Sequence, residues 1–379
     1  MSARHACDVA VVGGGPAGLA AALAARRAGL DVVVLEPRPS PIDKACGEGL
    51  MPSALAALAA LGVDLGGAGR AFRGVAYVSG ATVAAADFPG GASGRGLRRT
   101  ELHAALVAAA ARAGVEIRAE RAEALTARGV AAAGGELAAR WVVGADGLRS
   151  RVRHWAGLAR GTGGAPPRFG LRRHLALAPW SERVEIVFGD SAEAYVTPLA
   201  ADEIGVALLW RGVARGFDDL LATRFPAGLR RRLAGARVTA RDLGTGPFRQ
   251  ATRGVARGRV ALVGDAAGSL DALTGEGLAC AFEEALALGP ALALGDLVGY
   301  ARASARLRRV PETVTRLALL LARHPALRRR AVAALAADPA LFSRLIGLLG
   351  ARGRLRELGG GAVARFGARL VVPALGAAG

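Results

Sequence analysis

The residues with the clearest chemical meaning lie near the N-terminus, where three glycines of residues 13–18 follow the spacing G-x-G-x-x-G. Glycines at this spacing permit a tight turn, a close approach of backbone to a pyrophosphate, and close packing of a helix on a strand. An acidic residue after the next strand is placed to accept hydrogen bonds from an adenosine ribose. The residues expected to contact a dinucleotide are Gly13, Gly15, Pro16, Ala17, Gly18 and Glu36.

This chemistry requires specific elements on both sides of the glycines. The apolar run Val9–Val12 predicts a buried strand, and the Ala/Leu-rich segment after Gly18 predicts a helix to about Ala28. Gly29 ends that helix, and Asp31–Leu35 predicts a second strand that leads to the acidic residue. The helix N-terminus would present free N–H groups and a positive dipole end to phosphates.

Composition excludes several classes of protein. A hydrophobic content of 52% and a mean hydropathy of +0.32 exclude general disorder. The sequence contains no uninterrupted run of about 18 apolar residues, so we expect no membrane-spanning helix. The first strand begins so early that we expect no signal peptide. Cys7, Cys46 and Cys280 show neither metal-binding nor disulfide spacing, so we expect no metal site and a cytoplasmic, reduced protein.

The formal charge of +19 raises the question of a nucleic-acid partner. Lys44 is the only lysine, Gln250 is the only glutamine and asparagine is absent, whereas Arg, Ala and Gly abound. This usage is typical of a GC-rich coding sequence, and the arginines are scattered along the chain. We therefore expect no nucleic-acid binding and treat the charge as mostly background.

The middle and the end of the chain differ in character. Several β-like runs between residues 168 and 210 predict an antiparallel sheet, and residues after about Gly275 predict helices interrupted at Pro290, Pro311, Pro325 and Pro339. The fold class is therefore α/β, with a Rossmann-like domain built from discontinuous segments, an α+β substrate domain and C-terminal helices. The predicted units are residues 1–70, 95–165 and 250–295 for the cofactor domain, 71–94 and 166–249 for the substrate-binding sheet, and 296–379 for the helical region.

Three motifs together resemble FAD-dependent oxidoreductases of the p-hydroxybenzoate hydroxylase and geranylgeranyl reductase superfamily. They are the glycine fingerprint with its acidic residue, the segment Gly144–Gly147, and Gly264–Gly268 followed by Leu273–Leu278. The resemblance spans residues 8 to 278 and implies one tightly bound FAD. Only one full fingerprint is present, so the resemblance implies that NAD(P)H docks transiently as the reductant.

The third motif would serve the flavin end of the cofactor. Asp265, at a strand end, would accept a hydrogen bond from a ribityl hydroxyl. The segment Thr274–Gly277 would start a helix whose N–H groups and dipole face the N1–C2=O edge, which becomes negative on reduction. The contacts implied here are Gly264, Asp265, Thr274, Gly275, Glu276, Gly277 and Leu278.

Four further residues are implied as cofactor contacts. Arg99 matches the arginine that reaches the phosphate or ribityl region, although Arg98 is an alternative. Asp146 resembles a residue beside the flavin, or it simply ties down its loop. Lys44 and Cys46 lie in a segment similar to the cysteine–glycine segment of the geranylgeranyl reductase branch. Cys46 is the one catalytic candidate, and its alternative is a small buried apolar residue.

The predicted antiparallel sheet should form a wall over the flavin and help to bind the substrate. Its candidate substrate contacts are His174, Phe188, Tyr195 and Trp210. Because side chains alternate between the two faces of a strand, about half of such residues should face away from the site.

The leading functional hypothesis is a monooxygenase that uses molecular oxygen and a flavin hydroperoxide to hydroxylate a small organic, secondary-metabolite-like substrate. The alternative enzyme is a geranylgeranyl-reductase-like ene-reductase acting on an isoprenoid or other apolar double bond. A flavin-binding membrane or partner module without turnover is the non-enzyme alternative. We expect the C-terminal helices, with arginines such as Arg328–Arg330, to cap the substrate domain; the alternative is contact with a membrane surface or carrier protein.

Overall fold

The computed structural model describes residues 7–164, 166–350 and 360–371. The larger of its two main sheets has eight strands, which run in the order β19-β20-β11-β1-β2-β8, with β10 and β9 continuing from β11. The central pairings are parallel and the outer hairpins antiparallel. Its strands are β1 (Cys7–Val12), β2 (Val32–Leu35), β8 (Glu116–Arg118), β9 (Ala122–Leu125), β10 (Gly129–Ala132), β11 (Gly135–Gly144), β19 (Ala256–Arg257) and β20 (Val260–Leu262).

The second sheet has seven strands in the order β17-β13-β16-β15-β14-β5-β6 and is antiparallel except where β14 meets β5. One face buries an apolar cluster and the other faces the first sheet's loops across the cavity described below. Its strands are β5 (Gly74–Ser79), β6 (Thr82–Asp87), β13 (Arg168–Ala176), β14 (Arg183–Phe188), β15 (Ala192–Pro198), β16 (Glu203–Arg211) and β17 (Arg237–Thr245). Small ladders join β3 (Gly49–Leu50), β7 (Gly94–Gly96) and β4 (Arg70–Phe72), and β12 (Ala159–Arg160) with β18 (Ala251–Thr252).

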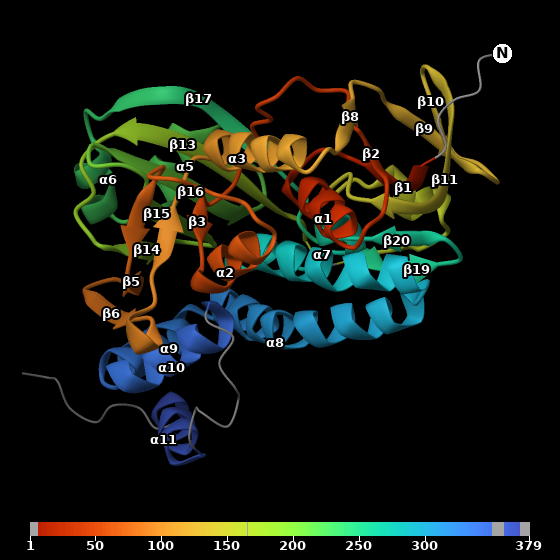
Figure 1. The fold of residues 1–379 in the computed structure, drawn as a ribbon. Coiled ribbons are helices and arrows are strands. Elements are labelled where there is room, and N and C mark those ends of the chain that lie inside the picture. Colours follow the sequence, from red (N-terminus) through yellow and green to blue (C-terminus); the bar gives the residue numbers. More distant parts are fainter. Residues whose placement is uncertain (1–6, 165, 351–359, 372–379) are drawn as a thin grey trace, which may run out of the picture.

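Helices cover the sheets on several sides, and α7 lies between α1 and α8 (Figure 1). The close contact of α7 with α1 depends on Gly289, where a Cβ atom would lie 2.4 Å from the Ala24 carbonyl oxygen. The helices are α1 (Pro16–Arg27), α2 (Pro52–Ala60), α3 (Arg99–Arg112), α4 (Arg151–Trp155), α5 (Phe217–Arg224), α6 (Ala227–Leu233), α7 (Gly277–Leu294), α8 (Leu297–Arg323), α9 (Pro325–Ala336), α10 (Pro339–Gly350) and α11 (Gly360–Val371), with 3-10 turns η1 (Pro89–Gly91) and η2 (Gly264–Ala267).

The N-terminal β1-α1-β2 unit forms as its sequence predicts. The four residues of β2 and the last four of β1 are all buried, and the two strands pair in parallel register. Gly29, with a φ of +82°, allows the chain to leave α1 and turn into β2. The expected mixed α/β fold class is therefore confirmed.

The prolines of the C-terminal region divide into two kinds. Pro325 and Pro339 begin α9 and α10, as expected, because a proline at the first helical position loses no intrahelical hydrogen bond. Pro290 and Pro311 lie inside α7 and α8, so the predicted breaks at these two positions are wrong. Packing of α7 against α1 and α8 outweighs the local cost of the proline.

Among the described helices, α7 alone is long and apolar enough to cross a membrane, and 56% of it is buried inside the protein. It is an apolar core helix packed between α1 and α8. The pair α9 and α10 would pass the same test only as one span, and the two helices are bent by 107°.

Candidate cofactor and active site

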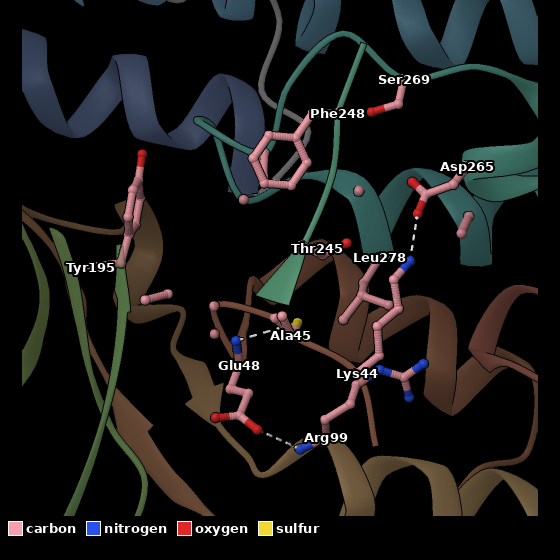
Figure 2. A pocket seen from close by; sticks show the side chains of 18 of the residues that line it. Lys44, Ala45, Glu48, Arg99, Tyr195, Thr245, Phe248, Asp265, Ser269 and Leu278 are labelled. Carbon is pink, nitrogen blue, oxygen red and sulfur yellow. Dashed lines mark hydrogen bonds and ion pairs between the residues drawn. The ribbon is translucent and has the colours of Figure 1, made fainter. Parts of the chain in front are cut away.

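A cavity of about 600 Å³ lies between the two sheets. The turns that follow β1, β11 and β20 line one end of it, and the inner faces of β5, β14 and β16 line the other. Tyr195 lies across the cavity from Lys44 and Asp265 (Figure 2). The cavity therefore joins the predicted cofactor motifs to the predicted substrate sheet.

The glycine fingerprint forms one end of this cavity. Gly13 has a φ of +105°, and a Cβ atom on Gly18 would lie 1.8 Å from the Gly13 carbonyl oxygen, so both positions require glycine. Gly15 differs, because a Cβ atom there would meet nothing within 4 Å. Gly15 also precedes α1 without any side-chain cap, so the helix presents free N–H groups to open space. Pro16 and Ala17 line the same end.

Glu36 is held directly behind the fingerprint. Its carboxylate accepts hydrogen bonds from the Gly14 N–H at 2.9 Å and from the Arg38 guanidinium at 2.8 Å. Burial would raise the pKa of Glu36, but the hydrogen bonds from Arg38 and Gly14 outweigh it and hold the pKa below its ordinary value. His103 supports the same loop through a 2.9 Å contact with the Gly14 carbonyl oxygen, a role that the sequence analysis missed.

The turn η2 carries Asp265 at the end of β20. Lys44 Nζ lies 3.2 Å from the Asp265 carboxylate, so two predicted cofactor contacts from distant segments face each other in the cavity. Arg153 of α4 is buried and donates to the carbonyl oxygens of Asp265 and Ala266 and to that of Leu148. Arg153 thereby connects the turn after β20 to the turn after β11.

In addition to Arg153, an ion pair between α7 and α8, which we call the Glu284–Arg308 clamp, holds η2. Glu284 of α7, fully buried, accepts a 3.0 Å hydrogen bond from the Gly264 N–H and pairs with Arg308 of α8. Arg308 also donates to the carbonyl oxygens of Gly264 at 2.8 Å and Gly268 at 2.7 Å. No local sequence pattern indicates this pair, because its members are far from the motif and are ordinary charged residues.

The segment before α7 also lines the cavity. Gly275 has a φ of +71°, and neither Gly275 nor Gly277 would place a Cβ atom within 4 Å of another residue. Thr274 and Leu278 face the cavity as well, whereas Glu276 is buried away from its described lining. The helix begins at Gly277, three residues later than expected.

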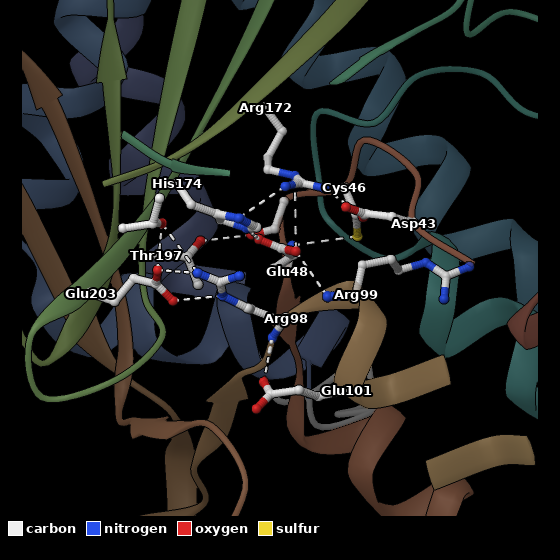
Figure 3. A network of polar contacts seen from close by, with 12 residues as sticks. Asp43, Cys46, Glu48, Arg98, Arg99, Glu101, Arg172, His174, Thr197 and Glu203 are labelled. Carbon is white, nitrogen blue, oxygen red and sulfur yellow. Dashed lines mark hydrogen bonds and ion pairs between the residues drawn. The ribbon is translucent and has the colours of Figure 1, made fainter. Parts of the chain in front are cut away.

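The structure separates the neighbouring arginines at the start of α3. Arg98 extends toward Glu203 of the second sheet and donates to its carboxylate at 2.7 Å, whereas Arg99 extends the opposite way (Figure 3). Arg99 is 6% exposed and lines the cavity, and its Nη1 has no hydrogen-bond partner among the described residues. An unpartnered buried guanidinium suits an anionic or oxygen-rich ligand.

A buried polar network fixes the segment that carries Cys46 (Figure 3). Glu48, a non-glycine residue with a φ of +57°, accepts from the Arg99 backbone N–H at 2.8 Å and contacts His174 Nε2 at 2.6 Å. Arg172 lies 2.9 Å from His174 Nδ1 and 2.5 Å from Asp43. Because an arginine only donates, Nδ1 accepts, and His174 donates from Nε2 to Glu48.

The two remaining cofactor candidates, Cys46 and Asp146, both line the cavity, but they differ in their hydrogen-bond partners. The Cys46 sulfur accepts the Glu48 backbone N–H at 3.4 Å, and burial raises the pKa of the thiol. A protonated thiol is a poor nucleophile. The Asp146 carboxylate binds the Ser150 hydroxyl at 2.5 Å and the Arg151 N–H at 2.6 Å, which ties its loop to the start of α4.

Of the four candidate substrate contacts, the structure places Tyr195 alone in the described cavity lining. Its hydroxyl donates to the Leu273 carbonyl oxygen, and burial raises its pKa well above the ordinary value, which keeps the phenol neutral. His174 belongs to the Glu48 network. Phe188 packs beneath Arg328, and Trp210 stacks near Phe169.

The opposite half of the cavity is apolar. We call it the apolar chamber and define it by six residues of one packed cluster, which come from the position just before α2 and from β4, β5, β14 and α10. They are Met51, Phe72, Val75, Val184, Ile186 and Ile346.

The residues present fit FAD. The uncapped start of α1 with open space at Gly15 suits a pyrophosphate, and the open glycines before α7 suit a flat ring. Between these ends lie the unpartnered Nη1 of Arg99 and the Lys44–Asp265 pair, which suit a ribityl chain or phosphate.

Comparisons with known proteins agree with this geometry. A model described as "FAD binding domain" matches residues 6–305. The menaquinone reductase of Mycobacterium tuberculosis is 54% identical over 63 residues, and that of Mycolicibacterium smegmatis is 61% identical over 56 residues. These matches span 17% and 15% of this chain, and only 15% and 14% of the relatives' length.

Solved structures share the fold over nearly the whole chain. A flavoprotein/dehydrogenase from Cytophaga hutchinsonii has a TM-score of 0.78 at 19% identity, covering 91% of this chain and 93% of that chain. The flavin-dependent brominase Bmp2 has a TM-score of 0.74 at 17% identity, with 92% and 100% covered. A geranylgeranyl bacteriochlorophyll reductase-like protein from Thermoplasma acidophilum has a TM-score of 0.69 at 20% identity, with 97% and 98% covered.

At these identities, the structural likeness concerns the fold. The family model, in contrast, spans most of the chain and includes both cofactor-side turns, at Gly13–Gly18 and at η2. The expected resemblance is confirmed. The chain belongs to the FAD-binding domain family.

Proposed function

We propose that this chain is an FAD-dependent reductase that adds two hydrogens across a carbon–carbon double bond of an elongated apolar, isoprenoid-like substrate. The observation that carries the proposal is the apolar chamber, which forms the half of the cavity opposite the cofactor motifs. Burying an apolar chain contributes about 25 cal/mol per Å², which holds a substrate that offers few polar groups. The short match to proteins named menaquinone reductase supports a reductive reaction.

The chain's own residues would bind, orient and exclude water. Arg99 and Lys44 would hold polar groups of the cofactor, and the glycines at 275 and 277 would let the backbone approach its ring. The Glu48–His174 contact would fix the Cys46 segment beside that ring. When bound and reduced by NAD(P)H as a transient reductant, the flavin would supply the hydride, and solvent would supply the proton that completes the addition.

A monooxygenase that hydroxylates a small organic substrate with molecular oxygen is the second candidate. Its support is the shared fold of the flavin-dependent brominase, because bromination of an organic compound is an oxidation. The same apolar chamber would then exclude water from the oxygen chemistry. The two candidates differ in whether oxygen is consumed.

One experiment separates them. The purified FAD-loaded protein is reduced under anaerobic conditions and mixed with an isoprenoid quinone or a polyprenyl diphosphate, and the flavin spectrum is followed. Reoxidation of the flavin without oxygen, with a product that has gained two hydrogen atoms at a carbon–carbon double bond of the isoprenoid chain and not at a quinone ring, is the expected result. Reoxidation only after oxygen is admitted, with a product that has gained one oxygen atom, would favour the monooxygenase. A protein that binds no FAD would contradict both.

A further inference from the structure

The C-terminal helices carry a basic surface that the cofactor chemistry does not use. Residues 297–379 contain 15 arginines and 3 acidic residues, so these 83 residues hold +12 of the formal charge of +19. Basic residues are therefore more concentrated in this part of the chain than in the rest of it. Codon bias explains why the cations are arginines, but it does not explain why acidic residues are so few here.

Helix α8 displays this charge together with exposed apolar side chains. Positions three or four residues apart share one helix face, and exposed residues of α8 recur at this spacing. We call this surface the α8 stripe and define it as Leu294, the last residue of α7, together with Val298, Arg302, Arg306, Arg309, Arg316, Leu317 and Leu320 of α8. The exposed fractions of its apolar members are 82% for Leu294, 65% for Val298, 57% for Leu317 and 46% for Leu320.

The arginines of α8 differ in their partners. Arg308 points inward and pairs with Glu284, and Arg316 pairs with Glu312 at 2.8 Å. Three exposed arginines of α8 have no carboxylate partner within the described part of the chain, namely Arg302, Arg306 and Arg309. A row of unneutralised cations therefore lies between two pairs of exposed aliphatic residues.

We propose that the α8 stripe docks this protein on the surface of an anionic lipid bilayer. Arginines on a helix that lies in the plane of the membrane pair with lipid phosphates, and leucines on the same face enter the acyl boundary. A nucleic acid would be contacted through the arginines but would gain nothing from four exposed aliphatic side chains. The combination of charge and apolar exposure therefore favours lipid.

The same helix packs behind the cavity wall. The residues between the two exposed leucines, Ala318 and Leu319, pack against a buried cluster that includes Leu273 and Phe248, which line the cavity. Docking would place this wall next to the lipid in which an apolar substrate dissolves. That consequence rests on the proposed reductase function, whereas the docking itself does not.

Vesicle co-sedimentation of the full-length FAD-loaded protein tests the proposal. We expect binding to phosphatidylcholine vesicles that contain phosphatidylglycerol and little binding to pure phosphatidylcholine vesicles. The triple variant R302E/R306E/R309E should bind at least about tenfold more weakly, and L317S/L320S should also lose affinity at unchanged charge. The matched controls are R231E/R237E/R241E, which changes exposed arginines on the α6–β17 side (Figure 1), and Val213→Ser, at a residue 90% exposed elsewhere.

Flavin content and circular dichroism of each variant show that it has folded. Absence of binding to the anionic vesicles would overturn the proposal. An equal loss of vesicle affinity in both triple variants would also overturn it, because binding would then depend on the total charge of the protein and not on the α8 stripe. Vesicle-independent binding of DNA, or a dimer that the α8 variants convert to monomer, would assign the stripe to another occupant. None of these outcomes depends on turnover, so the reductase proposal is tested separately.

Discussion

At the scale of single residues, type and spacing identify candidates, but surroundings decide what each can do. Arg98 and Arg99 are adjacent and chemically identical, yet Arg98 forms an ion pair with the second sheet, whereas Arg99 lines the cavity and its Nη1 has no hydrogen-bond partner in the described part of the chain. Likewise, the four substrate candidates of the second sheet were all aromatic or histidine residues on predicted strands, and the direction in which each side chain points decides its role. Tyr195 faces the cavity, and His174 is part of a buried network instead.

Substituting the two arginines separately tests this difference. Arg99→Gln should weaken FAD binding by roughly 10- to 100-fold, since a hydrogen bond to a charged group contributes about 1.5–3 kcal/mol. Arg98→Gln should leave FAD affinity nearly unchanged and lower the free energy of unfolding by about 1 kcal/mol. Flavin titration of the apo-protein and urea unfolding measure the two effects. A larger affinity loss in the Arg98 variant would contradict the assignment.

Glu36 predicts a dependence of stability on pH. Because its folded-state pKa lies below its ordinary value of 4.5, the carboxylate stabilises the fold above that pH, and this contribution is lost as the pH falls through the folded-state value. Urea unfolding between about pH 6 and pH 3 should show the difference between wild type and Glu36→Gln shrinking below 4.5. The control is Glu123→Gln, at an exposed glutamate. A constant difference would show that the charge of Glu36 is immaterial.

At the scale of elements, helices and strands are locally encoded, and the turns that join them are held by residues from elsewhere. The turn η2 after β20 depends on Arg153 of α4 and on the Glu284–Arg308 pair of α7 and α8. The start of α1 depends on its own glycines as well as on Glu36 and His103, which hold the backbone of Gly14.

The two glycines at the start of α1, Gly15 and Gly18, should differ in how an added methyl group changes the stability of the protein. Gly18→Ala forces the helix away from the Gly13 carbonyl and should destabilise the fold by about 1–3 kcal/mol or more. Gly15→Ala fills open space at an allowed φ of −70°, so the apo-protein should unfold as wild type while FAD affinity falls. Thermal unfolding of both apo-proteins and flavin titration check this pair. Equal destabilisation of both would contradict the close packing seen at Gly18.

The Glu284–Arg308 clamp gives a second test at this scale. Arg308→Leu leaves a fully buried carboxylate without its cation and should lower the free energy of unfolding by about 3–5 kcal/mol. Arg309→Leu, at the exposed neighbouring position, should change it by less than about 0.5 kcal/mol. Chemical denaturation of the two variants measures the difference. Similar stabilities would mean that η2 does not depend on the clamp.

At the scale of the whole molecule, the cavity is shared by both sheets, so a bound cofactor should stabilise both. At FAD concentrations of 100 times the dissociation constant, the free energy of unfolding should rise by about 2.7 kcal/mol. Hydrogen exchange should slow at Gly15 and Asp265 and also at Thr197 and Leu209 of the second sheet. Protection confined to the first sheet would contradict a shared site. Thermal unfolding with and without FAD provides the companion measurement.

The sequence by itself determined the elements and motifs whose signals are local. The strands near Val9–Val12 and Asp31–Leu35, and several strands between residues 168 and 210, appear where alternation or apolar runs predicted them, because burial of neighbouring side chains selects the backbone. The fingerprint glycines were also predictable, because the turn and the close helix packing require residues without a Cβ atom.

Only the tertiary structure decided which residues from distant segments meet. The contact of Lys44 with Asp265 joins residues 221 positions apart, and that of His174 with Glu48 joins residues 126 positions apart. The two-residue repeat of a strand predicts that alternate side chains share a face, but it does not predict which face lies toward the cavity. Such long-range contacts are set by the packing of α7, α8 and both sheets around one cavity, and no local pattern encodes that packing.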